Sequence, residues 1–172
     1  MRTIGYRLLT RDAFAPYGSY ASILAPGGVR FGEPPVEFYR DMVQQTLGST
    51  NMVSYSCCVV RAKEEWLIEN AEYHNHTCEA ILCLDGDYLM HVTPACQEDE
   101  EPWDSMEVFL IPKGTLVVTR PGVWHQAGFP YGCGEVHILC ALPERAYVND
   151  CVCKTIPEEK RIKVVDSPAD LL

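Results

Sequence analysis

EAILCLDGDYLMHV, residues 79–92, is the stretch that decides the fold. It holds two short runs of apolar, aromatic and β-branched residues, which are typical of buried β-strands. Leu84-Asp85-Gly86-Asp87 stands between the two runs. Asp-Gly favours the positive φ angles of a tight hairpin turn. The stretch therefore predicts two β-strands joined by a short turn.

Similar runs lie on both sides of this stretch. They are MVSYSCCVVRA (52–62), MEVFLI (106–111), TLVVT (115–119) and EVHILCAL (135–142), and Pro112-Lys113-Gly114 is typical of a second turn. Several short strands at this spacing indicate an all-β sandwich or a closed barrel. Helix is a minor component, and we expect only short helical turns, over Thr10–Tyr17 with Thr10 as the cap and over Pro157–Val165.

The size of the chain favours one domain over residues 1–172. We divide it into an N-terminal arm with strands (1–50), a barrel core (51–156) and a C-terminal segment (157–172). Ala25–Pro35 is rich in Gly and Pro, so it predicts an irregular loop.

The net charge of −10, with scattered Lys and Arg, argues against nucleic acid or an anionic membrane as a partner. The acidic stretch Glu98–Asp104 predicts a solvated loop.

The nine cysteines include the adjacent pair Cys57 and Cys58 and a CxC pair, Cys151 and Cys153, but no CxxC. This spacing fits neither a zinc ribbon nor a thioredoxin-like site. We expect most of these cysteines to be buried, reduced thiols. The N-terminus lacks an apolar run typical of a signal peptide, and no segment has the length of a membrane span, so the expected location is cytoplasmic.

The segment His74-Asn75-His76-Thr77-Cys78-Glu79 carries the residues most typical of a metal site. On an extended strand His74 and His76 point to the same face, since side chains alternate. His125 follows a turn at Arg120-Pro-Gly. We predict that His74, His76, Glu79 and His125 bind one divalent ion, such as Zn, Mn, Ni, Fe or Co. His91 and His137 are interpreted as structural residues.

This pattern resembles the cupin superfamily, whose first motif has HxH, a Glu and, after six intervening residues, a Gly. Here Gly86 stands at that place after Glu79, although the interval from His76 to Glu79 is one residue short. Pro112-Lys-Gly114 and His125 match part of the second motif. The resemblance implies a double-stranded β-helix, or jelly-roll, barrel. It also implies a homodimer, for which we expect the segment up to Arg40, with Phe31, Phe38 and Tyr39, to form the contact.

The chain also resembles the ureidoglycolate lyase family of cupins. The similar patches are Ala13–Gly18, Tyr39–Asp41, Arg61-Ala62, Glu72 with His74, Glu79-Ala80, Val123-Trp124-His125, Asp150-Cys151 and Ile156-Pro157-Glu158. In that family the first segment reads His, two residues, Gly, Thr, Gln. This chain therefore has His76 where no histidine is expected and Glu79 in place of glutamine.

The family resemblance implies a carbon–nitrogen lyase that releases urea from ureidoglycolate and leaves glyoxylate. An α-hydroxy acid or ureido acid would then chelate the metal. Candidates for the acid and base are Glu79, Glu72 and Tyr88. Arg61, or else Lys113 or Arg120, is expected to bind the substrate carboxylate. Phe129 is expected to face the pocket, and Trp124 to pack away from it.

Two other functions fit the same sequence. One is a different metal-dependent cupin enzyme, such as a sugar isomerase or an iron dioxygenase, because one ligand set serves both redox and non-redox chemistry. The other is a non-catalytic, small-molecule-binding barrel. No basic segment or pair of DNA-binding helices is evident in the sequence to transmit such a signal.

Overall fold

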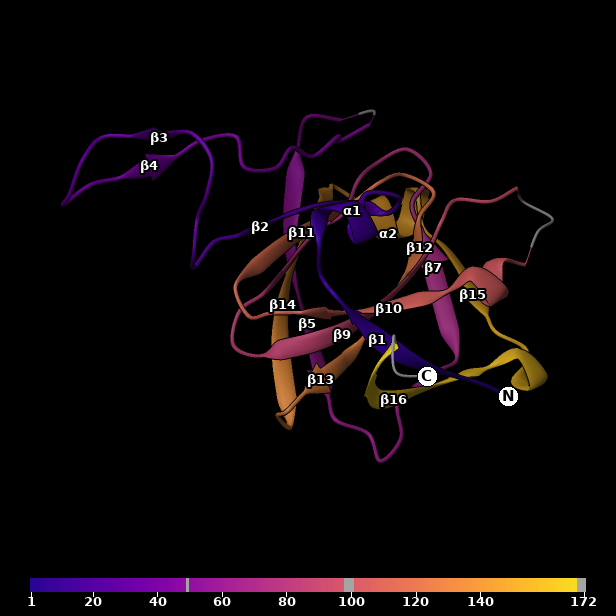
Figure 1. Ribbon diagram of the computed structural model, residues 1–172. Coiled ribbons are helices and arrows are strands. Elements are labelled where there is room, and N and C mark those ends of the chain that lie inside the picture. The colour runs from indigo at the N-terminus through magenta and orange to yellow at the C-terminus, as the bar shows by residue number, and fades with distance from the viewer. Residues whose placement is uncertain (49, 98–100, 170–172) are drawn as a thin grey trace.

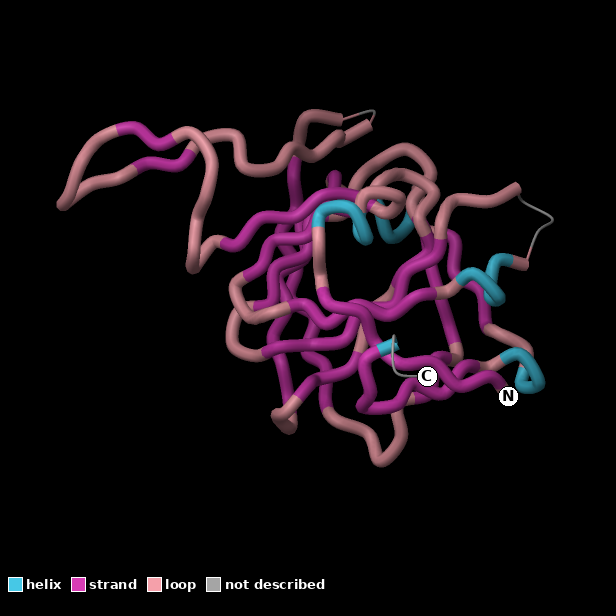
Figure 2. Tube along the Cα trace, viewed as in Figure 1, coloured by secondary structure: helices cyan, strands magenta, loops and turns pink. Residues whose placement is uncertain are grey.

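β-Strands are the main regular elements of the structure, and the helices are few and short (Figures 1 and 2). The computed structural model describes residues 1–48, 50–97 and 101–169. The strands before the centre of the chain are β1 (Arg2–Leu8), β2 (Gly18–Ser22), β3 (Arg30–Phe31), β4 (Phe38–Tyr39), β5 (Val53–Arg61), β6 (Leu67–Ile68), β7 (Asn70–Tyr73) and β8 (Ala80–Cys83). Those after it are β9 (Asp87–Thr93), β10 (Glu107–Ile111), β11 (Thr115–Thr119), β12 (Trp124–His125), β13 (Phe129–Tyr131), β14 (Glu135–Pro143), β15 (Val152–Thr155) and β16 (Ile162–Pro168).

The strands follow a jelly-roll topology. One antiparallel sheet has the order β2-β11-β8-β14-β5, and the second contains β7-β12-β9-β10. From β5 to β14 the chain passes from one sheet to the other at most connections, and the pairs β6–β7, β9–β10 and β12–β13 each follow one another within the second sheet. This alternation is the double-sheet arrangement of cupins. The expected all-β cupin fold is therefore confirmed.

The core of the barrel lies between the two sheets. Along β9, Tyr88, Met90 and Val92 point into this core, whereas Leu89 belongs to a second apolar cluster on the other face of the sheet. β9 is buried on both faces, and Leu89 shares its cluster with Tyr6 of β1 and with Ile162 and Val164 of β16. β1 lies parallel to β10 and to β16 and joins both to the second sheet.

The predicted hairpin at residues 84–87 is wrong. β8 and β9 form where expected, but β8 pairs with β11 and β14, and β9 pairs with β10, β12 and β13. The connection crosses between the sheets, and neither Asp85 nor Gly86 has a positive φ. Gly86 is needed for space instead, because a Cβ there would lie 2.8 Å from Val136 Cγ1. The second predicted turn is present, with Gly114 at φ +71.

The two expected helical turns have different outcomes. α1 (Arg11–Phe14) begins after Thr10, whose hydroxyl accepts a hydrogen bond from Ala13 N, as predicted. The expected helix over Pro157–Val165 is wrong, since only a 3-10 turn, η2 (Glu158–Lys160), precedes β16. Ile162 and Val164 are buried on one face of that strand, so pairing with β1 overrides the weak helical tendency. The sequence also gave no sign of η1 (Pro102–Ser105) or α2 (Ala146–Asn149).

An arm formed by β3 and β4 extends from the barrel (Figure 1). It contains much of the segment Ala25–Pro35 that the sequence predicts as a loop, and only β3 in that segment is regular. The side chains of Phe31 and Phe38 are exposed on this arm. The homodimer, and the part of the arm in it, stay predictions.

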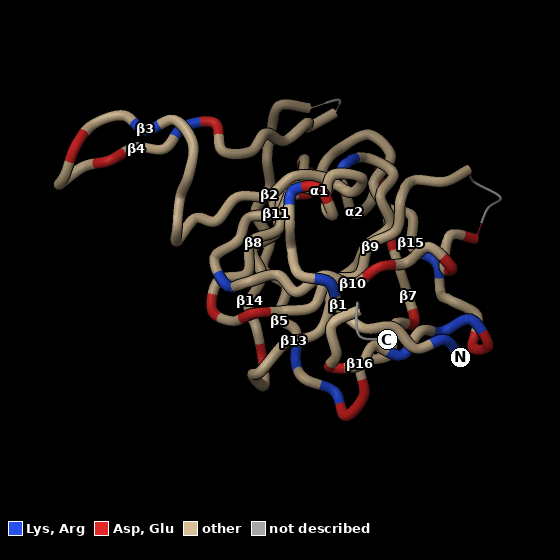
Figure 3. Tube along the Cα trace, in the orientation of Figure 1, with Lys and Arg blue, Asp and Glu red and all other residues tan. Residues whose placement is uncertain are grey.

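Lys and Arg are interspersed with Asp and Glu along the chain (Figure 3). Several basic residues form ion pairs, including Arg7 with Glu107 and Lys163 with Glu65. Residues 98–100 of the acidic stretch Glu98–Asp104 lie outside the described residues, and the stretch ends in η1, where Trp103 is buried. No helix in the described part of the chain has both the length and the apolar character needed to cross a membrane.

The expectation that most cysteines are buried is wrong. All nine are free thiols, but only Cys78, Cys83 and Cys140 are buried. Cys57, Cys133 and Cys153 are exposed, and the other three are partly buried.

We expect Gly128→Ala to lower the free energy of unfolding by about 2 kcal/mol or more. An added Cβ would lie 1.5 Å from the carbonyl oxygen of Leu89, which is backbone and cannot move aside. Gly134→Ala is the matched control, since nothing lies within 4 Å of its Cβ position. Thermal or urea unfolding measures both variants, and equal stabilities would contradict the described approach of this loop to β9.

Candidate metal and substrate site

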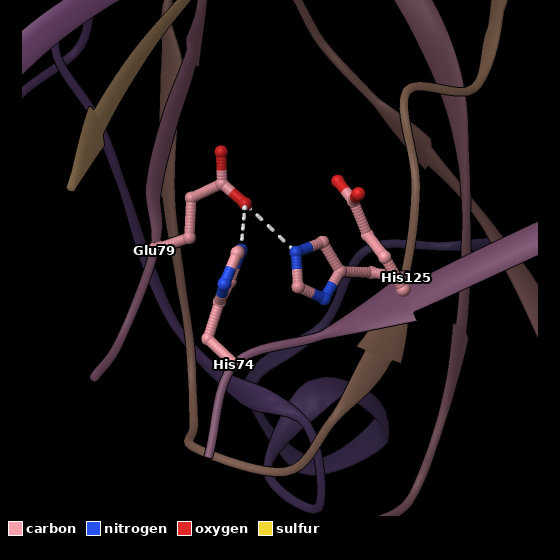
Figure 4. A group of neighbouring side chains, drawn as sticks. His74, Glu79 and His125 are labelled. Carbon is pink, nitrogen blue, oxygen red and sulfur yellow. Dashed lines mark hydrogen bonds and ion pairs between the residues drawn. The ribbon is translucent and has the colours of Figure 1, made fainter. Parts of the chain in front are cut away.

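Three of the predicted ligands, His74, Glu79 and His125, point toward one another (Figure 4). His74 follows β7, Glu79 precedes β8, and His125 lies on β12. The Oε2 atom of Glu79 is 2.8 Å from His125 Nε2 and 3.4 Å from His74 Nε2. All three side chains are buried. The jelly roll therefore brings together residues that are far apart in the chain.

The Nδ1 atom of each histidine is hydrogen-bonded to a backbone carbonyl oxygen. His74 Nδ1 is 2.5 Å from the carbonyl oxygen of Asp150, and His125 Nδ1 is 2.8 Å from that of Val123. Since a carbonyl only accepts, each Nδ1 carries the proton. In the neutral rings both Nε2 lone pairs then face the Glu79 carboxylate. Lone pairs and a carboxylate repel one another, so this arrangement requires a positive charge, either a proton or a metal ion.

The electrostatics of the group agree with this requirement. Burial by itself would raise the pKa of Glu79, but His125 and His74 outweigh it and hold the pKa well below its ordinary value. Burial likewise would lower the pKa of His74, yet the Glu79 carboxylate and the Asp150 carbonyl raise it. The carboxylate is therefore an anion that attracts a cation to the two imidazoles.

Glu72 completes the group. It lies on β7 directly opposite His125 of β12, and opposed residues of an antiparallel pair share a face. Ligand atoms of Glu72, His74, Glu79 and His125 all lie within 4.8 Å of one another. His74 Nε2 is buried and makes no hydrogen bond to a described residue. Two imidazoles fixed through Nδ1, with two carboxylates, fit a divalent metal ion.

His76 does not lie with this group, so the expectation that it shares a face with His74 is wrong. β7 ends at Tyr73, and the chain bends at Asn75 and His76. The Asp150 carboxylate fixes this bend by accepting hydrogen bonds from the backbone N–H groups of Asn75 and His76, at 2.8 and 2.9 Å. The His76 ring contacts the same carboxylate, and its side chain is 76% exposed.

A cavity of about 230 Å³ adjoins the group. Glu72, Glu79 and His125 line it, together with Tyr88, whose hydroxyl has Met90 Sδ as a neighbour at 3.6 Å. The remaining lining residues are Cys58, Ile81, Met90, Gln126, Ala127, Ile138, Cys140 and Tyr147. Sequence reasoning missed Gln126, although it follows His125 directly, and Tyr147, which no local pattern indicates.

The predicted substrate-binding residues lie elsewhere. Arg61 is exposed and pairs with Glu135 at 2.8 Å. Arg61 and buried Phe129 line a neighbouring cavity, which shares Gln126 and Ala127 with the first. Lys113 and Arg120 are exposed in turns and line neither of these two cavities. The structure thus does not bring these four residues to the group of histidines and carboxylates.

Three further residues, Trp124, His137 and His91, lie on strands and point away from the histidine group. Trp124 packs against Tyr73 and Trp103 on the outer face of its sheet, as expected. His137 is half-exposed and lies 2.6 Å from an Asp85 carboxylate oxygen. His91 lies on β9 with its side chain buried, and burial lowers its pKa to about 4, so it is neutral at physiological pH.

Comparison with known proteins gives a family and distant structural neighbours. The sequence profile of the ureidoglycolate lyase family matches residues 1–163. Solved structures with a similar chain include a dTDP sugar isomerase from Desulfovibrio desulfuricans G20, with 14% identity, 83% of each chain covered and a TM-score of 0.45. Another is a dTDP-4-dehydrorhamnose 3,5-epimerase from Elizabethkingia anophelis NUHP1, with 12% identity, 77% of this chain and 69% of that chain covered, and a TM-score of 0.39. A comparison with curated proteins gave no match.

We predict that the metal-free protein becomes less stable as the pH rises from about 6 to 8. The pKa of His74 is raised in the folded state, so its contribution is complete below its ordinary value of 6.5 and is lost as the pH rises through the folded value. Glu79 does not change charge in this pH window. Its pKa is lowered in the folded state, so its contribution to stability is lost only in acid. Glu79→Gln should therefore remove part of the pH dependence.

Urea unfolding in the presence of a chelator measures this effect. Wild type and Glu79→Gln with the same slope of stability against pH would contradict the coupling between His74 and Glu79.

Proposed function

This chain belongs to the ureidoglycolate lyase family, and we propose that it cleaves ureidoglycolate to glyoxylate and urea in the cavity beside His74, Glu79 and His125. One observation carries the chemical part of the proposal. Two imidazoles, each fixed through Nδ1, turn their Nε2 atoms toward one buried carboxylate. Such a group is typical of a metal centre.

The proposed cofactor is one divalent ion, of the class Zn, Mn, Ni or Fe. His74 Nε2, His125 Nε2 and Glu79 would hold it, with Glu72 as a fourth ligand or as a group beside it. When bound, the ion supplies Lewis acidity that lowers the pKa of a substrate hydroxyl. His76 is not part of this proposal, because its ring lies in solvent.

The cavity suits a small polar substrate. Its volume of about 230 Å³ is below the range for drug-sized ligands. Apolar side chains, including Ile81, Met90 and Ile138, form much of its wall, and a few polar groups stand among them. We propose that the amide of Gln126 orients the substrate, since the basic residues expected for this task lie outside the cavity.

Cleavage moves one proton from oxygen to nitrogen. The substrate hydroxyl loses its proton, its carbon becomes the aldehyde of glyoxylate as the carbon–nitrogen bond breaks, and the departing nitrogen gains a proton to give urea. Glu79 is a poor base for this step, because both imidazoles hold its pKa low. Glu72 lines the same cavity, so we assign the base to Glu72.

Tyr88 is the proposed proton donor to the leaving nitrogen. Burial raises the pKa of its phenol well above the ordinary value, so the group stays protonated. Its hydroxyl contacts the thioether of Met90, which is a weak acceptor, and therefore remains able to donate to a ligand.

We expect His74→Ala and His125→Ala to lose bound metal and to release urea at least a hundredfold more slowly. Loss of a residue that only supports a ligand already costs about 10–100-fold, so loss of a ligand should cost more. His76→Ala is the matched control from the same loop, and it should keep its metal and a rate within about twofold of wild type. Elemental analysis and a urea-release assay on ureidoglycolate measure both properties.

The outcomes separate the alternatives. Metal retained by wild type without urea release would sink the lyase assignment and favour another cupin reaction, such as sugar isomerisation or oxygenation, or small-molecule binding alone. Loss of metal in His76→Ala but not in His74→Ala would contradict the ligand set.

Tyr88→Phe should lower kcat by about a hundredfold or more with little change in KM, the range for loss of a general acid. The substitution removes one oxygen and conserves the ring, so the fold is kept. Tyr6→Phe is the control, since its hydroxyl pairs with that of Tyr131 outside the cavity. An unchanged kcat in Tyr88→Phe would exclude this residue as the donor.

A further inference from the structure

Two thiols and a carboxylate form a second cluster beside the histidine group. Cys151 and Cys153 are the CxC pair. Cys151 stands just before β15, and Cys153 lies in it. β15 pairs with β7, and this pairing places Cys153 directly opposite Glu72. Residues two apart on a strand point to the same face. The three side chains therefore meet on one side of the sheet, and their ligand atoms lie within 4.8 Å of one another.

We propose that Cys151, Cys153 and Glu72 form a binding site for a thiophilic divalent cation of the zinc class. This site shares Glu72 with the histidine group, but its two thiol ligands belong to no other site, and the inference goes beyond the proposed function and does not depend on it. Thiolate sulfur is a preferred ligand of Zn²⁺, and a carboxylate oxygen is an accepted third ligand.

The distances between the donor atoms match a tetrahedral zinc site. Sulfur ligands about 2.3 Å from one zinc ion, at the tetrahedral angle, are about 3.8 Å apart. The two Sγ atoms here are 3.6 Å apart. A sulfur and an oxygen ligand of one ion are about 3.6 Å apart by the same geometry, and Glu72 Oε2 is 3.4 Å from Cys151 Sγ and 3.2 Å from Cys153 Sγ.

The same separation does not suit a disulfide, in which the two sulfur atoms are about 2.05 Å apart. The thiols instead direct their protons to the carboxylate, and binding of a cation would release those protons to solvent. Three protein ligands leave one tetrahedral position open. Since Cys153 is exposed, water can reach this position.

Glu72 links the two sites. Both thiols contact its Oε2 atom, so Oε1 remains without a thiol contact. Glu72 also belongs to the group with His74, Glu79 and His125. A cation at the thiol site would therefore fix the orientation of a carboxylate that borders the cavity.

The test is a Cd²⁺ titration of the full chain, stripped of metal and kept reduced with a phosphine. Cd²⁺ bound to thiolate gives an ultraviolet charge-transfer absorption that histidine and carboxylate ligands do not give. Wild type should show this absorption with one equivalent of Cd²⁺. Cys151→Ser and Cys153→Ser should each lose most of it, whereas Cys57→Ser, which removes another exposed thiol, should keep it.

Two further measurements distinguish the proposed thiol site from a loss of folding and from the proposed lyase site. His74→Ala should keep the thiolate absorption, since it leaves all three ligands of the proposed site in place. Alkylation followed by peptide mapping should show that Zn²⁺ protects Cys151 and Cys153 but not Cys57. Absence of the absorption in wild type, its retention in Cys153→Ser, or equal alkylation with and without Zn²⁺ would each overturn the proposal.

Discussion

The site depends on one electrostatic constraint, namely that Glu79, a buried carboxylate, faces two imidazole nitrogens whose rings cannot turn. Backbone carbonyls of Asp150 and Val123 hold the Nδ1 protons of His74 and His125. Both Nε2 lone pairs are thereby directed at an anion, inside a region from which water is largely excluded. Only a cation makes this arrangement favourable, and a divalent metal ion satisfies the two imidazoles and the carboxylate together.

The jelly roll supplies this constraint through connections between sheets. Glu79 is fixed to the first sheet, where Thr119 N donates to its carbonyl oxygen at 2.9 Å. His125 belongs to the second sheet. Gly122, three residues before His125, donates a hydrogen bond from its backbone N–H to the carbonyl oxygen of His74 at 2.7 Å. Asp150 then closes the loop that carries His74. The site is therefore held by backbone contacts from both sheets.

The sequence was sufficient for most of the strands and for the meeting of His74, Glu79 and His125, because apolar runs and the spacing of these residues are local or motif-like features. It failed where a distant residue decides the outcome. Alternation placed His76 beside His74, but Asp150, 74 residues after His76, bends the chain out of strand geometry. Arg61 was expected to bind substrate, yet its partner Glu135 is fixed only by the pairing of β5 with β14. Tyr147 reaches the cavity from α2, which has no sequence pattern of its own.

The most direct test of the account is nitrogen-15 NMR of the histidine side chains, recorded without metal and with one equivalent of Zn²⁺. The account predicts that His74 and His125 carry their protons on Nδ1 in the loaded protein, that their Nε2 resonances shift on metal binding, and that the resonances of His76 do not. If both rings instead keep protons on both nitrogens and do not respond to Zn²⁺, the positive charge beside Glu79 is protons alone, and the metal centre is contradicted.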